Sequence, residues 1–310
     1  MKKFVLVANS TIDETAAYYA KNDIKCASLS FTIDGQTIKE DFGATLPFHD
    51  FFEKLREGRM STTAQAQVGD YLGFFRDACE QGLDVVYLGF SSGLSGSFDA
   101  GCLAAREVLA DFPERTIRCI DSLSAAGGEC VLVEKARQLR DQGKTADECA
   151  DILEEMKLRV VHLVTVDDLN HLWRGGRVSR TSAVLGTLVG IKPIIYLDNN
   201  GKLQVCHKVR GRKQSLEYLG DELLHQLKAR ETSLRSANGG SIEEQIRQLW
   251  AQTIRISHGD CETDAEYLAG YLREHGVQNI AIRMIDTVIG SHTGPGVIAL
   301  FGEGSQRRPF

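Results

Sequence analysis

LDVVYLGFSSGLSGSFDAGCLAAREVLADF, residues 83–112, is the stretch that decides the fold we expect for this chain. It starts with the apolar run Leu83–Phe90 and ends with a helical pattern, Phe98–Phe112. The connection between them is rich in serine and glycine. A buried strand that turns directly into a helix is the repeating unit of an α/β sheet, so we expect a parallel sheet with helices on both faces.

The rest of the first half repeats this alternation of strand-like and helix-like segments. The expected helices are Thr11–Lys21, Leu46–Glu57 and Val68–Gln81, and the expected strands are Phe4–Ala8, Thr116–Ile120 and a hairpin of Cys26–Ile33 with Gln36–Lys39. The segments predict a Rossmann-like α/β domain over residues 1–159.

The second half predicts another α/β domain, over residues 160–310. It starts with the strand pattern Val160–Val166, after a charged helix at Ala146–Leu158. The stretch KPIIYLDNNGKLQVCHKV, residues 192–209, reads as an antiparallel hairpin, which makes this sheet mixed. Further expected elements are the helices Ser215–Ala229 and Thr263–Glu274, and strands at Thr253–Ser257, Ile280–Ile285 and Val297–Phe301. Residues 229–241 are polar with a Gly-Gly pair and read as a surface insertion or linker.

Composition excludes several classes of protein. The 310 residues are 43% hydrophobic and carry a net charge of −6, which argues against general nucleic-acid binding. Eight cysteines are scattered without zinc-site spacing, which favours free thiols in a reducing cytosol. The apolar start is too short for a signal peptide, and no run is long enough to span a membrane. We expect a cytoplasmic protein without a metal or cofactor.

The turn SSGLSGS, residues 91–97, is a candidate anion site. A glycine-rich turn before a helix offers free peptide N–H groups at the positive end of the helix dipole. It lacks the lysine of a Walker A loop and does not fit G-x-G-x-x-G. The alternative is that Ser95 or Ser97 only caps the helix.

Two other polar stretches could contribute to the same site. STTAQAQ, residues 61–67, and SHTGPGV, residues 291–297, are expected to be loops. The alternative for residues 61–67 is a polar loop without a ligand, which only caps the next helix. His292 in the second stands among glycines and a proline, where a histidine is often only structural or exposed to solvent.

The stretch WRGGRVSR, residues 173–180, holds three arginines at three-residue spacing: Arg174, Arg177 and Arg180. One interpretation is a helix end with basic residues that favour the C-terminal dipole. The other is a contact with an anion or an acidic partner.

An enzyme is the competing hypothesis. Ser95, Asp286 and His292 follow the chain order of the α/β-hydrolase triad. The nucleophile elbow of that fold needs G-x-S-x-G, however, and Ser97 stands where its last glycine belongs. A serine hydrolase that acts on acyl esters therefore stays open as the alternative.

Taken together, the motifs resemble the DegV family of bacterial proteins, which includes fatty-acid-binding proteins that serve a fatty acid kinase. The motifs, in order, are ANSTID, TTAQAQ, SSGLSGSFDAG, IDSLSAAGG, LNHLWRGGRVSR, GIKPII, KVRGRKQSLEYL, ISHGD and IGSHTGPG. The chain departs from the family pattern at Asn9, usually Asp, and at Ala64 and Ala66, where the family usually reads Ser and Pro.

The resemblance implies two α/β domains with a long-chain fatty acid in a buried tunnel between them. By motif position, Thr63 and Ser95 would contact the carboxylate, helped by the N–H of Gly96, and His292 would lie at the mouth of the site. The residues implied near the head group or on a docking surface are Thr62, Arg174, Arg177 and Arg180.

The function implied is binding, not catalysis. The protein would present the carboxylate to a separate kinase, which makes an acyl phosphate for phospholipid synthesis, with transient contact to the membrane surface. A binding protein for another amphipathic carboxylate is a further alternative.

Overall fold

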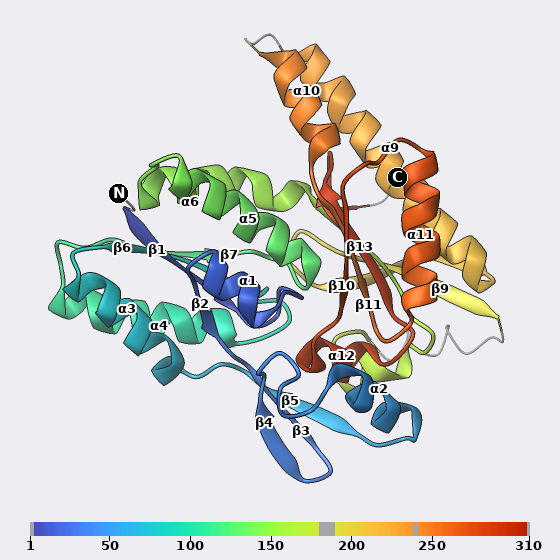
Figure 1. The fold of residues 1–310 in the computed structure, drawn as a ribbon, viewed down its shortest axis with the longest axis horizontal. Helices are drawn as coiled ribbons and strands as arrows, with labels where there is room; N and C mark the ends of the chain where they lie inside the picture. The colour runs from blue at the N-terminus through green and yellow to red at the C-terminus, as the bar shows by residue number, and fades with distance from the viewer. Residues whose placement is uncertain (1–2, 180–189, 238–240, 309–310) are drawn as a thin grey trace.

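The computed structural model describes residues 3–179, 190–237 and 241–308. Within them it contains a four-stranded parallel sheet, a six-stranded mixed sheet and a small three-stranded sheet. Figure 1 shows the four-stranded sheet on the left, the six-stranded sheet on the right and the small sheet below. This confirms the expected α/β fold with one parallel and one mixed sheet.

The parallel sheet comes from the first half of the chain. Its strands, in spatial order, are β2 (Ile24–Ala27), β1 (Phe4–Asn9), β6 (Asp84–Gly89) and β7 (Ile117–Asp121). Helices α1 (Ala16–Lys21), α5 (Gly127–Asp141) and α6 (Ala146–Met156) pack on one face, and α3 (Val68–Glu80) and α4 (Ser97–Asp111) on the other. Apolar side chains therefore point to both faces of each central strand, which is why the strand at 84–89 reads as a continuous apolar run.

The mixed sheet comes from the second half. Its strands, in spatial order, are β10 (Leu203–Arg210), β9 (Ile191–Leu197), β8 (Val160–Thr165), β13 (Ile298–Glu303), β11 (Ile254–His258) and β12 (Ile280–Met284). Helices α9 (Arg212–Ser236), α10 (Ile242–Ala251) and α11 (Glu262–Glu274) cover one face. The other face turns toward the first half, where α5 contacts it. The predicted division at residues 159 and 160 falls where the short helix η1 (Lys157–Arg159) ends, and it stays a prediction.

The small sheet corrects two expectations. Residues 61–67 were expected to form a loop, but Ser61–Ala64 is a strand, β5, because it pairs antiparallel with β3 (Ser30–Ile33). The hairpin of β3 with β4 (Gln36–Lys39) is confirmed, whereas Cys26 belongs to β2 in the parallel sheet. Helix α2 (Phe48–Arg56) buries Phe51 and Phe52 beside this sheet.

Two helices differ from the sequence expectation at their ends. Helix α1 does not start at Thr11, because Asp13 has a positive φ of 52° and the Thr15 hydroxyl caps the helix at Tyr18 N. The polar segment 229–241 was expected to be a linker, but α9 continues to Ser236 because Leu234 is buried in the core that α9 and α10 share.

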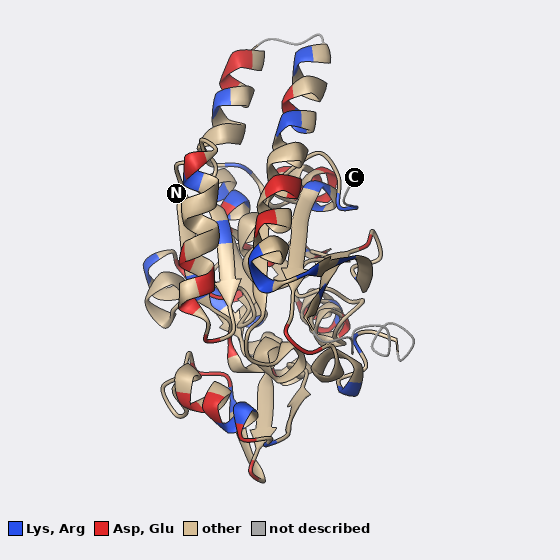
Figure 2. Cartoon of the chain, turned by 90° about the vertical axis from the view of Figure 1, so that its right-hand side faces the viewer, with Lys and Arg blue, Asp and Glu red and all other residues tan. Residues whose placement is uncertain are grey.

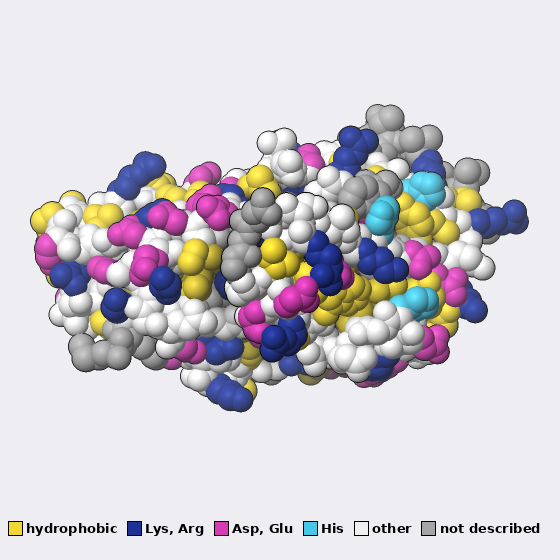
Figure 3. Space-filling view, turned by 90° about the horizontal axis from the view of Figure 1, so that it is seen from above, with side chains coloured by type: hydrophobic (Ala, Val, Ile, Leu, Met, Phe, Trp, Pro, Cys, Tyr) yellow, Lys and Arg dark blue, Asp and Glu magenta, His cyan; other side chains and the backbone are white. Residues whose placement is uncertain are grey.

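The α9–α10 pair projects from the body of the molecule (Figures 1 and 2). Figure 2 shows that acidic and basic residues are spread along both helices. From above, Figure 3 shows basic and acidic side chains interspersed around apolar patches over the whole face.

The last correction concerns a motif that was expected to be a loop. His292 was expected in a loop, but it lies in the short helix α12 (Thr287–Thr293). The sequence pattern also predicts helical segments on both sides of residues 174–180, and the second of them falls in 180–189, outside the described residues. Helix α7 (Asn170–Arg174) ends at Gly175, as the basic helix end predicts.

Candidate ligand-binding site

A cavity of about 230 Å³ lies between the mixed sheet and the loops of the first half. Its walls are mainly apolar. Strands β8, β9 and β13 supply part of the lining, namely Val164, Ile195, Leu197, Ala299 and Phe301. These side chains belong to the face of the mixed sheet that the outer helices leave uncovered. The cavity can therefore hold an apolar group away from water.

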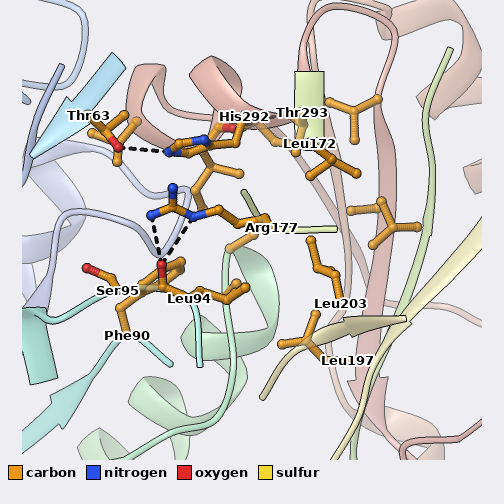
Figure 4. Close-up of a pocket in the computed structure, with 18 of the residues that line it drawn as sticks. Thr63, Phe90, Leu94, Ser95, Leu172, Arg177, Leu197, Leu203, His292 and Thr293 are labelled. Atoms are coloured by element: carbon orange, nitrogen blue, oxygen red, sulfur yellow. Dashed lines mark hydrogen bonds between the residues drawn. The ribbon is translucent and has the colours of Figure 1, made fainter. Parts of the chain in front are cut away.

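One end of the cavity is polar, and it gathers the residues that the sequence singled out. Thr63 of β5, Ser95 and Gly96 of the turn after β6, and His292 of α12 all line it. Arg177, three residues after α7, lines it as well. Figure 4 shows Thr63, Ser95, Arg177 and His292 around this end, with Leu172, Leu197 and Leu203 farther along. Four distant segments of the chain thus converge on one polar end.

Thr63 and His292 are joined directly. The Thr63 Oγ1 lies 2.8 Å from the His292 Nε2 (Figure 4). Burial, together with the charge of Arg177, lowers the pKa of His292 to about 4. The imidazole is therefore neutral near pH 7, so one ring nitrogen carries a proton and the other has a free lone pair.

Ser95 is held in place by the start of α4. Its Oγ accepts a hydrogen bond from Ser97 N at 3.2 Å and lies 3.0 Å from Ser97 Oγ. The N-cap of α4 is Gly96, which has no side chain to cap the helix. A Cβ on Gly96 would lie 2.2 Å from Gln65 Oε1, so the Gln65 side chain packs directly over this glycine. Ser95 thus stabilises the first turn of α4 through this hydrogen bond, and its side chain also lines the cavity.

Arg177 is a positive charge without an anionic partner among the described residues. Its Nη2 and Nε donate to the Leu94 carbonyl at 2.9 and 3.3 Å, and its Nη1 donates to the Gly175 carbonyl (Figure 4). Burial lowers the pKa of this guanidinium. A partly buried cation that contacts only carbonyl oxygens is well suited to an anionic ligand.

Two of the other predicted head-group residues line a neighbouring pocket. Thr62 and Arg174 line a second, more polar pocket and not the apolar cavity. Arg180 lies outside the described residues. The structure adds Gly175, which the sequence explained only as a helix end. A Cβ there would lie 2.1 Å from His292 Nδ1, so the glycine at position 175 lets the imidazole pack against the backbone.

The hydrolase arrangement is not formed. Asp286 caps α12, with its Oδ1 accepting from Val288 N at 2.7 Å and Ile289 N at 2.9 Å. His292 is one and a half turns later in the same helix and contacts Thr63, while Ser95 contacts Ser97. The described contacts therefore do not link Ser95 to a histidine base, as a nucleophilic serine requires.

The cysteines and the helices show two further features. The eight cysteines are all free thiols. Among the helices formed by the described residues, none combines the length and the apolar character that crossing a bilayer requires.

Comparison with known proteins identifies the family. A family model described as "Uncharacterised protein, DegV family" matches residues 3–303. A DegV domain-containing protein of Clostridium perfringens is 37% identical over 100% of both chains. Among solved structures, a DegV family protein from Thermus thermophilus that binds fatty acid is similar to this chain. Its sequence is 25% identical, and the TM-score is 0.78 over 98% of this chain and 100% of that one.

A further solved structure has the same fold. The Streptococcus pneumoniae Fatty Acid Kinase (Fak) B3 protein, loaded with linoleic acid, is 22% identical, with a TM-score of 0.78 over 96% of this chain and 98% of that one. The family model extends over both sheets, and the Clostridium relative aligns from end to end. The chain belongs to the DegV family.

Proposed function

We propose that this protein binds a long-chain fatty acid in the apolar cavity, with the carboxylate at the polar end. One observation carries the proposal: a mainly apolar cavity ends at hydroxyls, a peptide N–H and a guanidinium that contacts only carbonyls. The fatty acid binding of the Thermus relative supports the same ligand.

In the proposed complex, Thr63, Ser95 and the N–H of Gly96 donate hydrogen bonds to the carboxylate. Arg177 supplies the compensating charge, and the N–H at Nε2 of neutral His292 donates to the Thr63 Oγ1, which leaves the Thr63 hydroxyl hydrogen for the carboxylate. Hydrogen bonds to an ionised oxygen are about twice as strong as those between neutral groups. The acyl chain of the ligand adds affinity because each buried CH₂ contributes about 0.8 kcal/mol. A fatty acid of sixteen carbons would gain roughly 12 kcal/mol before the costs of association.

We also propose that the protein is cytoplasmic and presents the carboxylate to a separate kinase. A carboxylate oxygen would attack the γ-phosphorus of ATP, which forms the acyl phosphate and releases ADP. The proposal requires the carboxylate to lie at an end that the kinase can approach. Thr63, Arg177 and His292 line both the cavity and a neighbouring pocket, so the polar end of the cavity borders that pocket.

The test is to identify what the protein carries. Purified protein is denatured and extracted, and the extract is analysed by mass spectrometry. We expect a long-chain fatty acid in about one-to-one ratio with protein. An amphipathic carboxylate of another class would have a different mass. If extraction yields no lipid and the protein takes up no added palmitate, the proposal is wrong.

A further inference from the structure

Two aromatic side chains, His162 and Phe301, line the cavity away from its polar end. Strand β13 follows α12 along the chain, so the strand starts near His292. From there Val297, Ala299 and Phe301 all line the cavity, and two residues along a strand advance by about 7 Å. Phe301 is therefore the deepest lining residue of β13, and the pairing with β8 places His162 directly opposite it.

The rings of His162 and Phe301 meet edge to face. Their centroids are 5.3 Å apart, and the ring planes are 85° from parallel. This is one of the arrangements that aromatic pairs prefer. Each residue is only 1% exposed, so the pair is enclosed by protein on the sides that do not face the cavity. Together the two rings occupy the space into which the cavity would otherwise continue.

The His162 ring is held in one orientation by two hydrogen bonds. Its Nδ1 donates to the Val160 carbonyl at 3.0 Å, and its Nε2 accepts from the Ala125 N–H at 3.3 Å. Burial, together with the charge of Arg307, lowers the pKa of His162 well below its usual value, so the imidazole is neutral. Both ring nitrogens have protein partners. In contrast to the polar end, this part of the lining therefore offers a ligand no polar contact.

The start of helix α5 lies directly against both rings. A Cβ on Gly128 would lie 2.2 Å from the His162 Nε2, and a Cβ on Gly127 would lie 2.8 Å from the Phe301 Cδ2. The space between the helix backbone and the rings is thus too small even for a methyl group. Because protein interiors are close-packed, the rings cannot retreat toward α5 without moving the helix.

We propose that His162 and Phe301 form the end wall of the cavity and thereby set the longest acyl chain that this protein binds. The inference rests on the proposed function, which places the carboxylate at the polar end and the chain along the mixed sheet. Up to the wall, each additional CH₂ is buried and adds affinity. A longer chain must bend back or displace packed side chains, which costs free energy in a close-packed interior. Affinity should therefore stop increasing at one chain length.

The experiment measures the Kd of laurate, myristate, palmitate, stearate and arachidate, each of which has two more CH₂ groups than the one before. Two variants change the depth of the cavity in opposite directions. Phe301→Leu removes the ring from the wall, whereas Ala299→Ile adds bulk one step nearer to the polar end. The control is Phe75→Leu, because Phe75 is fully buried on α3 and does not line the cavity. Thermal unfolding shows whether each variant is folded.

For wild-type protein, we expect each pair of added CH₂ groups to tighten binding by about tenfold or more until the limit is reached. Beyond it, the next longer acid should bind no more tightly. Phe301→Leu should move this limit to a longer acid, and Ala299→Ile should move it to a shorter one. Phe75→Leu should lose thermal stability but keep the wild-type limit.

An unchanged limit in folded Phe301→Leu, or the same shift in the control, would overturn the inference. If Phe301→Leu does not fold, an unchanged limit in Ala299→Ile overturns it instead. Wild-type protein separates this inference from the proposed function. If it binds none of the acids, the proposed function is wrong and the end wall falls with it. If its affinity still increases from stearate to arachidate, it binds fatty acids and only the end wall is wrong.

Discussion

Replacing Gly175 by alanine tests whether His292 must stay where the structure places it. Gly175 has φ −72° and ψ −7°, a conformation that alanine adopts without strain. The effect of Gly175→Ala must therefore come from the added methyl group. That methyl carbon would lie 2.1 Å from His292 Nδ1.

The size of the disturbance follows from this distance. Ordinary contacts start at 3.4 Å, so the imidazole or the backbone must move by roughly 1.3 Å. The Thr63 Oγ1 to His292 Nε2 distance is 2.8 Å, and a displacement of the ring by that amount disrupts the length or the angle of this hydrogen bond. A hydrogen bond to a charged ligand is worth about 1.5–3 kcal/mol. We therefore expect the Kd for palmitate to rise roughly 10- to 150-fold.

The assay is displacement of a fluorescent fatty acid, with thermal unfolding measured on the same samples. Gly73→Ala is the matched control, because Gly73 lies within α3 and nothing lies within 4 Å of its added Cβ. The control should keep wild-type affinity and gain about 1 kcal/mol of stability from the better helix propensity of alanine. Wild-type affinity in folded Gly175→Ala would refute the reasoning that places His292 against the ligand.

Three further predictions concern the site and the core. Thr63→Val and Ser95→Ala should each weaken palmitate binding by about 1.5–3 kcal/mol in isothermal titration, and unchanged affinity in both would mean that other groups hold the carboxylate. Wild-type protein should not hydrolyse p-nitrophenyl acyl esters above background, and turnover that Ser95→Ala abolishes would instead support the hydrolase. Burial raises the pKa of Asp13 to about 7, so between about pH 4 and pH 7 the native state binds a proton that the unfolded chain has lost. The contribution of Asp13 to the free energy of unfolding should therefore fall as pH rises through this range. Asp13→Asn should remove that contribution in urea denaturation, and an unaltered pH slope would contradict the prediction.

Two misplaced motif segments show where local sequence signals fail. Residues 61–64 are polar and carry no buried apolar run, yet they form β5 because β3 provides the pairing strand. Residues 291–293 were expected to belong to a loop, yet they form the end of a helix that Asp286 caps. Ser291 Oγ donates to the Thr287 carbonyl at 2.7 Å within that helix. Both segments have a weak intrinsic propensity for the structure they adopt. In each, a hydrogen-bonding partner elsewhere in the chain stabilises that structure.

The sequence by itself determined the order of the buried strands and of most helices, because these elements leave periodic apolar patterns in the chain. Its motifs also singled out Thr63, Ser95 and His292, each of which lines the cavity. Only the tertiary structure showed that Gly175 packs against His292 and that Arg59 joins Arg174 in a second pocket beside the cavity. These pairs are 117 and 115 positions apart in the chain. Local patterns report which face of an element is buried, but contacts at this separation are set by how the sheets and loops pack together.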